Sequence, residues 1–233
     1  MAEKPSADAD ARTELVRAAR VVAGAGLSDA FGHVSVRRGS SLLITAPIPL
    51  AFQTPADVVT LSLDADDLPA GVPKEAWIHI AIARADSHVG AICRAQPRNV
   101  ARATTAGRSI RPLDGQGALL GPTVATYDDS RLVRDAAAAE TVAHLMGDAP
   151  AIVLRGNGAV TRGHDLGAAV ARMWLLDRSA DLSLHAPTSA APLAEGEQDW
   201  WRERDAELLP RIYDFLVRSH GDRPENDQKG DQR

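Results

Sequence analysis

Apolar and polar positions alternate along the chain with two periods, one typical of helices and one typical of strands. In residues 10–26, Leu15, Ala18, Ala19 and Val22 recur at helical spacing, and the pattern stops at glycines that suit a helix end. Further helices are predicted over residues 74–86, 131–147 and 164–186. Strands are predicted over residues 33–38, 41–46 and 57–64, from residue 91 onward, and from residue 151 into a glycine-rich turn. Such a mixture of helices and strands predicts an α/β fold.

The composition of the two ends predicts one folded domain with polar flanks. We expect a disordered segment at 1–9, a domain at 10–186, a linker at 187–198 rich in proline, alanine and serine, a C-terminal helix at 199–220 and a disordered tail at 221–233. Pro210 should interrupt the C-terminal helix, and the paired tryptophans Trp200 and Trp201 should anchor it to the body or to another subunit.

Charge and hydropathy narrow the classes of partner. The chain has 233 residues, a net charge of -5, and lysines and arginines scattered among acids, which argues against binding of nucleic acid. No apolar stretch is long enough to span a bilayer or to form a signal core, so we expect no membrane partner and a cytoplasmic location. The single cysteine, Cys93, lies in an apolar run and is interpreted as a buried hydrophobic residue.

Three segments, in order, carry a family resemblance. They are "GLSDAFGHVSVR" at 26–37, "PKEAWIHIAIARADSHVGAICRAQP" at 73–97 and "LRGNGAVTRGHDLGAAVARMWLLDRSA" at 154–180, with a looser match in "VATYDDSRLV" at 124–133. Together they resemble the class II aldolase/adducin family, which includes aldolases, epimerases and decarboxylases. The resemblance implies a three-layer α/β/α fold around a largely antiparallel sheet, in a homotetramer whose active sites lie between subunits.

In typical members of that family a divalent metal is held by a His-x-His pair at the end of a strand and by a third histidine in a glycine turn. A glutamate that opens a helix is the acid and base, which the resemblance assigns here to Glu75, and a tyrosine near the site corresponds to Tyr127. This chain departs from the pattern at every histidine, because Arg94 and Gln96 stand at the strand pair and Asn157 stands in the turn. A guanidinium cannot bind a metal, so we expect no metal and no other cofactor.

Several other polar residues are candidates for substrate binding. His33 and Ser35 lie in the opening motif, Thr45 stands where the family often binds a substrate phosphate, and His79 follows Glu75 by one helical turn. A structural role is the alternative for both histidines. A relocated metal site at Glu75, His79 and His33 is a weaker alternative.

Together with the resemblance, these residues predict a carbon–carbon lyase that acts on a small carboxylated or enolisable substrate, aromatic acids included. Arg94 would stabilise an enolate-like intermediate in place of the metal, Gln96 and Asn157 would add neutral donors, and Glu75 would carry the proton. For this role Arg94 should face a pocket open to solvent and not be sealed in a pair with Glu75. The alternative is a member that is not a lyase, either a cyclase-like enzyme or a binding or scaffold protein with an inactive Arg94–Glu75 pair.

Overall fold

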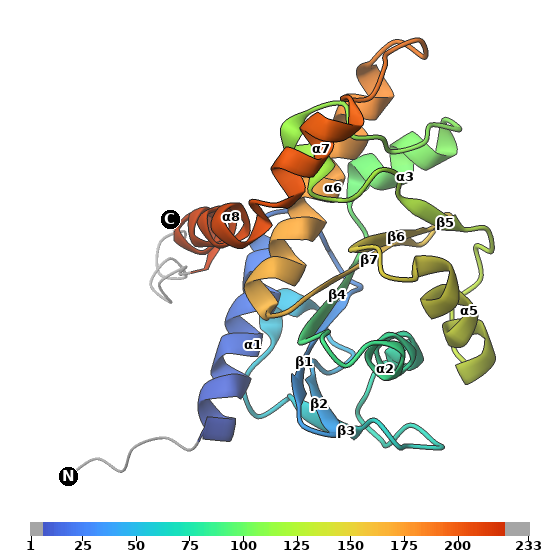
Figure 1. Cartoon of the computed structure of the whole chain (residues 1–233). Helices are drawn as coiled ribbons and strands as arrows, with labels where there is room; N and C mark the ends of the chain where they lie inside the picture. The colour runs from blue at the N-terminus through green and yellow to red at the C-terminus, as the bar shows by residue number, and fades with distance from the viewer. Residues whose placement is uncertain (1–6, 222–233) are drawn as a thin grey trace, which may run out of the picture.

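A computed structural model describes residues 7–221, which form a seven-stranded sheet with helices on both faces (Figure 1). The strands are β1 (His33–Arg38), β2 (Ser41–Ile44), β3 (Val59–Ser62), β4 (Ala91–Ala95), β5 (Ala125–Tyr127), β6 (Ala151–Leu154) and β7 (Gly158–Gly163). Their order in the sheet is β3-β2-β1-β4-β7-β6-β5, and only β5 and β6 are parallel. The prediction of a largely antiparallel sheet is therefore confirmed.

The helices complete the three layers that the resemblance implied. They are α1 (Ala7–Gly24), α2 (Ala76–Ala85), α3 (Arg98–Thr105), α4 (Gly115–Ala118), α5 (Ala136–Met146), α6 (Leu166–His185), α7 (Glu195–Arg202) and α8 (Asp205–His220), with a short 3-10 helix η1 (Leu50–Phe52). α1, α6 and α8 lie on one side of the sheet, and α2 and α5 lie on the other (Figure 1). None of the helices within residues 7–221 is long and apolar enough to cross a membrane.

Side chains of strand β4 pack into two hydrophobic cores, one on each face of the sheet. Ala91, Cys93 and Ala95 belong to the core under α1 and α6, whereas Ile92 belongs to the core under α2 and α5. Because side chains alternate along a strand, Arg94 also lies on the α2 side. Burial raises the pKa of the Cys93 thiol to about 12, which agrees with its interpretation as a buried, unreactive residue.

Strand β7 differs from the prediction made for this part of the sequence. Residues 151–160 were expected to form one strand that ends in a turn, but they contain β6, a turn and the start of β7, which pairs with both β4 and β6. Gly158 has a φ of +92°, and a Cβ there would stand 2.1 Å from the carbonyl oxygen of Ala95. Only glycine allows β7 to begin so close to the end of β4.

The chain ends also differ from the prediction. α1 begins at Ala7, so residues 7–9 are helical, and the expected linker already contains the start of α7 at Glu195. The C-terminal helical region bends after Arg202, between α7 and α8, while Pro210 lies inside α8. Residues 1–6 and 222–233, which make up most of the two segments expected to be disordered, lie outside the described residues.

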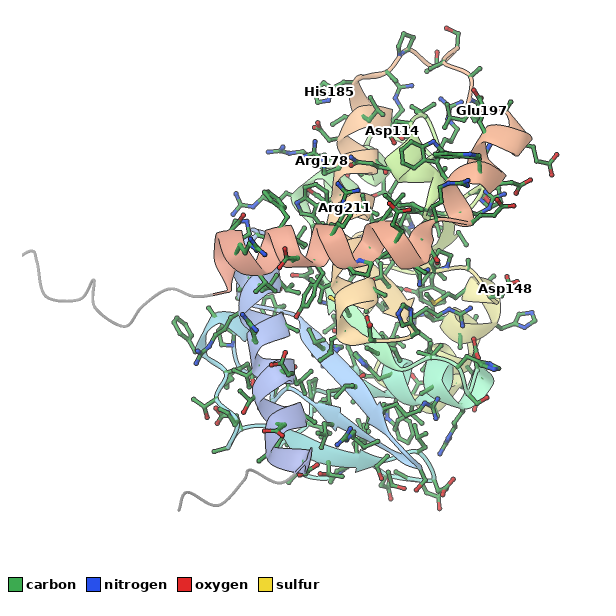
Figure 2. All side chains as sticks on the ribbon, turned by 60° about the vertical axis from the view of Figure 1, so that its left-hand side comes forward. Asp114, Asp148, Arg178, His185, Glu197 and Arg211 are labelled. Atoms are coloured by element: carbon green, nitrogen blue, oxygen red, sulfur yellow. The ribbon has the colours of Figure 1, made fainter. Side chains whose placement is uncertain are left out.

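The last two helices are fastened to the body of the domain. α8 crosses α1 and α6 (Figure 2). In α7, the ring of Trp201 packs so closely on Gly115 that a Cβ at that glycine would stand 1.9 Å from the ring. Trp201 therefore anchors α7 to the body, as expected, whereas Trp200 is 50% exposed.

Candidate active site

Four separate segments bring polar side chains together on the α2 side of the sheet. His33, the first residue of β1, lies directly opposite Arg94 of β4, and Gln96 follows the end of β4. Asn157 comes from the turn between β6 and β7. Glu75 stands at the N-cap position of α2, but its side chain makes no capping hydrogen bond. Strand order thus places residues that are more than 120 positions apart in the sequence at one site.

Arg94, Glu75 and Asn157 form a closed ring that consists of one ion pair and two hydrogen bonds. Arg94 Nη2 forms an ion pair with Glu75 Oε2 at 3.0 Å and donates a hydrogen bond to Asn157 Oδ1 at 2.8 Å. Asn157 Nδ2 donates to Glu75 Oε1 at 3.1 Å, and Gln96 Nε2 donates to Asn157 Oδ1 at 3.0 Å. The four residues that sequence reasoning grouped around the lost metal site therefore do lie together.

The expectation that Arg94 would be open to solvent and unpaired is wrong. Its side chain is 1% exposed, and Glu75, which is 13% exposed, is its counterion. The physical reason is that a buried guanidinium is stable only beside an anion. Even so, Arg94 Nε and Nη1 are buried without any hydrogen-bond partner among the described residues, so the pair leaves donor capacity unused.

A chain of buried hydrogen bonds runs behind the ion pair. Ser35 Oγ lies 2.6 Å from His79 Nδ1, and His79 Nε2 lies 2.6 Å from His33 Nδ1. His33 Nε2 then faces Glu75 Oε2 at 3.9 Å, which is too long for a hydrogen bond. Ser35 and His79 are fully buried and His33 is 4% exposed, so the chain reaches solvent only at its Glu75 end.

The surroundings shift the ionisation of these groups. Burial raises the pKa of Glu75, but the approach of His33 and the charge of Arg94 outweigh it, so this pKa lies below its usual value. Burial lowers the pKa of His33, and it lowers the pKa of His79 well below the usual value, with neighbouring positive charge adding to the effect. Burial also lowers the pKa of Arg94, against the influence of Glu75. At neutral pH the site therefore holds one carboxylate, one guanidinium and two neutral imidazoles.

Two residues selected from the sequence lie outside this cluster. Thr45 is fully buried, and its hydroxyl accepts a hydrogen bond from the backbone N–H of Val34 at 3.1 Å, which is a structural contact. Tyr127 is in β5, which β6 and β7 separate from β4, and it packs against the core under α2 and α5. Neither residue contacts Glu75 or Arg94 within the described chain.

Sequence reasoning missed the direct contact between the two histidines. One signal was present, because His33 and Ser35 alternate onto one face of β1 and His79 lies one turn after Glu75 on α2. These spacings predict faces, but they do not predict that α2 lies across β1.

Two hollows of the surface lie elsewhere. One of about 500 Å³ lies between α2 and α5 and is lined by Trp77, Arg84 and Glu140 among others. The other, of about 320 Å³, lies at the opposite end of β4 and β7, where Arg162 and Arg172 pair with Asp86 and Asp205. Neither is lined by a residue of the Glu75–Arg94 cluster.

Comparison with known proteins identifies the family. The family described as "Class II Aldolase and Adducin N-terminal domain" matches residues 13–184, which is most of the chain. The chain belongs to this family. Its match spans β1 to β7 and every residue of the polar cluster.

Curated proteins that are similar to the chain narrow the type of reaction within the family. Two proteins named 3,4-dihydroxyphthalate decarboxylase are similar to the chain. The one from Arthrobacter keyseri is 32% identical over 82% of this chain and 84% of the relative, and the one from Terrabacter sp. (strain DBF63) is 33% identical over 79% and 84%. Family and relatives together make the chain an enzyme of the lyase class, of the aldolase or decarboxylase kind.

Solved structures confirm the fold. An L-fuculose 1-phosphate aldolase from Glaciozyma antarctica PI12 superposes with a TM-score of 0.74 at 18% identity, covering 95% of this chain and 97% of that one. An L-fuculose-1-phosphate aldolase from Thermus thermophilus gives a TM-score of 0.66 at 27% identity, covering 75% and 94%. The class II aldolase fold is therefore shown.

The family is usually metal-dependent, but the residues at the expected position do not fit a metal. Arg94 places a positive charge there, and Asn157 Oδ1 already accepts hydrogen bonds from Arg94 and Gln96. A divalent cation needs free oxygen, nitrogen or sulfur lone pairs and would be repelled by the guanidinium. Among residues 7–221, no three His, Cys, Asp or Glu side chains are grouped so as to offer an alternative site.

Proposed function

We propose that the chain is a metal-free carbon–carbon lyase that decarboxylates a small hydroxylated aromatic dicarboxylate of the 3,4-dihydroxyphthalate class. The closed Arg94–Glu75 pair is also the arrangement expected of the inactive alternative; the observation that carries the proposal is that Arg94, beside the proton carrier Glu75, keeps Nε and Nη1 without a hydrogen-bond partner among the described residues. The names of two relatives supply the substrate class. A sugar phosphate is disfavoured, because the Thr45 hydroxyl is already engaged by Val34 and is fully buried.

Glu75 would move one proton between two atoms of the substrate. In a 3,4-dihydroxyphthalate, one carboxylate is ortho to a ring hydroxyl. Glu75, ionised at neutral pH, takes the proton of this hydroxyl, and the electron pair of the oxygen makes the ring carbon that bears the carboxylate basic. Glu75 then returns the proton to that carbon.

Loss of carbon dioxide completes the reaction. The carbon–carbon bond breaks, its electron pair restores the aromatic ring, and the resulting phenolate takes one proton from solvent. Negative charge on the ring oxygen is greatest after the first proton transfer and again after the bond breaks. Arg94, with unused donors at Nε and Nη1, and Gln96 would stabilise that charge.

The complete site would include a second subunit. Phe31, in the loop before β1, and Phe52, in η1, are 68% and 70% exposed. The two segments lie close together, because a Cβ on Gly32 would stand 3.2 Å from the Leu50 side chain. Large exposed apolar side chains beside a site are typical of surfaces that a partner covers. We expect a homotetramer in which Tyr127 approaches a neighbour's pocket.

Direct assay tests the proposal. Purified protein is incubated with 3,4-dihydroxyphthalate, and substrate loss and carbon dioxide release are followed together. The parent should release one carbon dioxide per substrate, and Glu75→Gln should lose activity by roughly a hundredfold or more. Glu207→Gln, which alters an exposed ion pair with Arg211 on α8, is the matched control and should behave as the parent. Absence of turnover on this acid and on related hydroxybenzoates would refute the decarboxylase assignment.

A further inference from the structure

His33 carries a buried nitrogen that nothing in the described chain satisfies. Its Nδ1 is held by His79 Nε2 at 2.6 Å, but its Nε2 has no hydrogen-bond partner. Buried polar atoms without a partner are rare, and each calls for a ligand, a water molecule or a functional reason. This nitrogen faces the Glu75 end of the cluster, which is where the substrate would bind.

The hydrogen bonds that connect Ser35, His79 and His33 determine which nitrogen of each imidazole ring carries the proton. Burial keeps both imidazoles neutral, so each ring has one donor and one acceptor. Two arrangements are then possible, in which every hydrogen bond from Ser35 through His79 to His33 points either toward Glu75 or away from it.

The Glu75 carboxylate selects between them. If the bonds pointed away, the bare lone pair of His33 Nε2 would face the negatively charged Oε2 at 3.9 Å, which is repulsive. If the bonds point toward Glu75, the Ser35 hydroxyl donates to His79 Nδ1, His79 Nε2–H donates to His33 Nδ1, and His33 presents an N–H to the carboxylate. Only this second arrangement points a donor, and not a lone pair, toward the carboxylate.

We infer that Ser35 and His79 are positioning residues that hold His33 as its Nε2–H tautomer, and that this N–H donates to an oxyanion of the bound substrate. His33 lies opposite Arg94 in the sheet, so the neutral donor and the cation flank the same position. Ser35 and His79 are fully buried behind His33 and act through it, which changes the direct substrate contact predicted for them from the sequence. The identity of the oxyanion rests on the proposed function, but the tautomer does not.

Nitrogen-15 NMR of the histidine rings tests the tautomer without any activity measurement. The seven histidines are labelled, and the signals of His33 and His79 are assigned with His33→Asn and His79→Gln. In the parent, both rings should show the Nε2–H pattern from about pH 6 to 8. In Ser35→Ala, His79 loses its donor, so both rings should shift toward a mixture with the Nδ1–H form.

Ser183→Ala is the matched control. Ser183 is also a buried serine; its hydroxyl accepts a hydrogen bond from the backbone N–H of Arg111, and it lies on α6, on the other side of the sheet. This variant should leave both histidine patterns unchanged. A Nδ1–H pattern for His33 in the parent, or identical patterns in parent and Ser35→Ala, would overturn the inference.

Ligand binding and turnover test the donor role. Titration with phthalate, a dicarboxylate that lacks the ring hydroxyls, should shift the His33 Nε2–H proton signal in the parent, and an unmoved signal in a saturated complex contradicts the donor role. With 3,4-dihydroxyphthalate, Ser35→Ala should lower kcat by roughly ten- to a hundredfold with little change in KM, while Ser183→Ala matches the parent. If the parent binds phthalate with this shift but turns over no substrate, the decarboxylase assignment fails and the inference about His33 stands.

Discussion

Arg94 and Glu75 form a buried ion pair in which Nη2 lies 3.0 Å from Oε2, and the same nitrogen donates to Asn157 at 2.8 Å. One nitrogen therefore serves two acceptors while Nε and Nη1 serve none. A substrate oxyanion that enters the site would meet a guanidinium whose charge is compensated but whose donors are not all used. Geometry as well as charge should then determine how well Arg94 works.

Substitutions of Arg94 distinguish the effect of its charge from the effect of its donor geometry. Arg94→Lys keeps the charge but loses the planar arrangement of donors, and turnover or ligand binding should fall by roughly ten- to a thousandfold. Arg94→Gln also removes the charge, so activity should fall further and the protein should be less stable, because Glu75 is left without its counterion. Steady-state kinetics and urea unfolding measure the two effects.

Arg162→Lys is the control for that experiment. Arg162 lies on β7, is 6% exposed and pairs with Asp86 outside the cluster, so its replacement perturbs a buried arginine without altering the site. Full activity in both Arg94 variants would show that Arg94 is structural and would remove it from the mechanism.

Elemental analysis tests the metal-free site. Protein purified without chelator should contain no stoichiometric zinc or other divalent metal, and EDTA should leave its activity unchanged. The combined variant Arg94→His, Gln96→His, Asn157→His restores the donor types of typical members and should gain zinc binding, which shows that the assay detects an occupied site. A stoichiometric metal in the parent that Gln96→Ala and Asn157→Ala release would contradict the prediction.

Acid should weaken the folded state through the two buried histidines. The pKa values of His33 and His79 are lowered from 6.5 in the folded protein, so below about pH 6.5 the unfolded chain binds protons that the folded chain does not. The free energy of unfolding then has its full value above about pH 6.5. Below that pH it falls, by up to about 1.4 kcal/mol per pH unit for each histidine. Glu75, whose pKa lies below its usual 4.5, does not contribute above about pH 5.

Urea unfolding at pH values between about 5 and 8 measures this dependence. His79→Gln should remove roughly half of the slope. His164→Gln, which changes an exposed histidine before α6, should keep the slope of the parent. Equal slopes of unfolding free energy against pH in the parent, His79→Gln and His164→Gln would contradict the prediction. They would mean that the buried histidines bind protons in the folded protein.

Association should depend on the exposed phenylalanine side chains beside the site. Light scattering should show a homotetramer, or at least a homodimer, at micromolar concentration. Phe52→Ser should weaken this assembly, because it removes a 70% exposed aromatic ring, whereas Phe215→Ser on α8 should not. A monomeric parent would remove the proposal that a neighbour completes the site.

The sequence predicted the layers better than it predicted the central strands. Helical periodicity located α2 and α6 to within two residues at each end, since their apolar faces pack on a sheet. It missed β7, because the sequence Gly158–Gly163 has glycine at both ends and resembles a continuation of the turn. The bend between α7 and α8 was placed at Pro210, yet that proline is accommodated within α8.

The site was predicted as a set of residues and not as a geometry. The family resemblance grouped Glu75, Arg94, Gln96 and Asn157 around one position, and their contacts show that the four side chains do lie together. The pairing of Arg94 with Glu75 depends on how deeply α2 lies over β4, which local patterns do not encode. For the same reason, the sequence did not predict that Ser35 and His79 are fully buried.

Strand β7 lies between β4 and β6, although it is the last strand along residues 7–221. During synthesis, six strands are complete before residues 158–163 leave the ribosome, and β4 and β6 each have an edge with no partner until then. Unpaired edges attract other strands, so the nascent chain is vulnerable to aggregation during this interval. Asn157 directly precedes β7. Its hydrogen bonds with Arg94 and Glu75 therefore form only when β7 has joined the sheet.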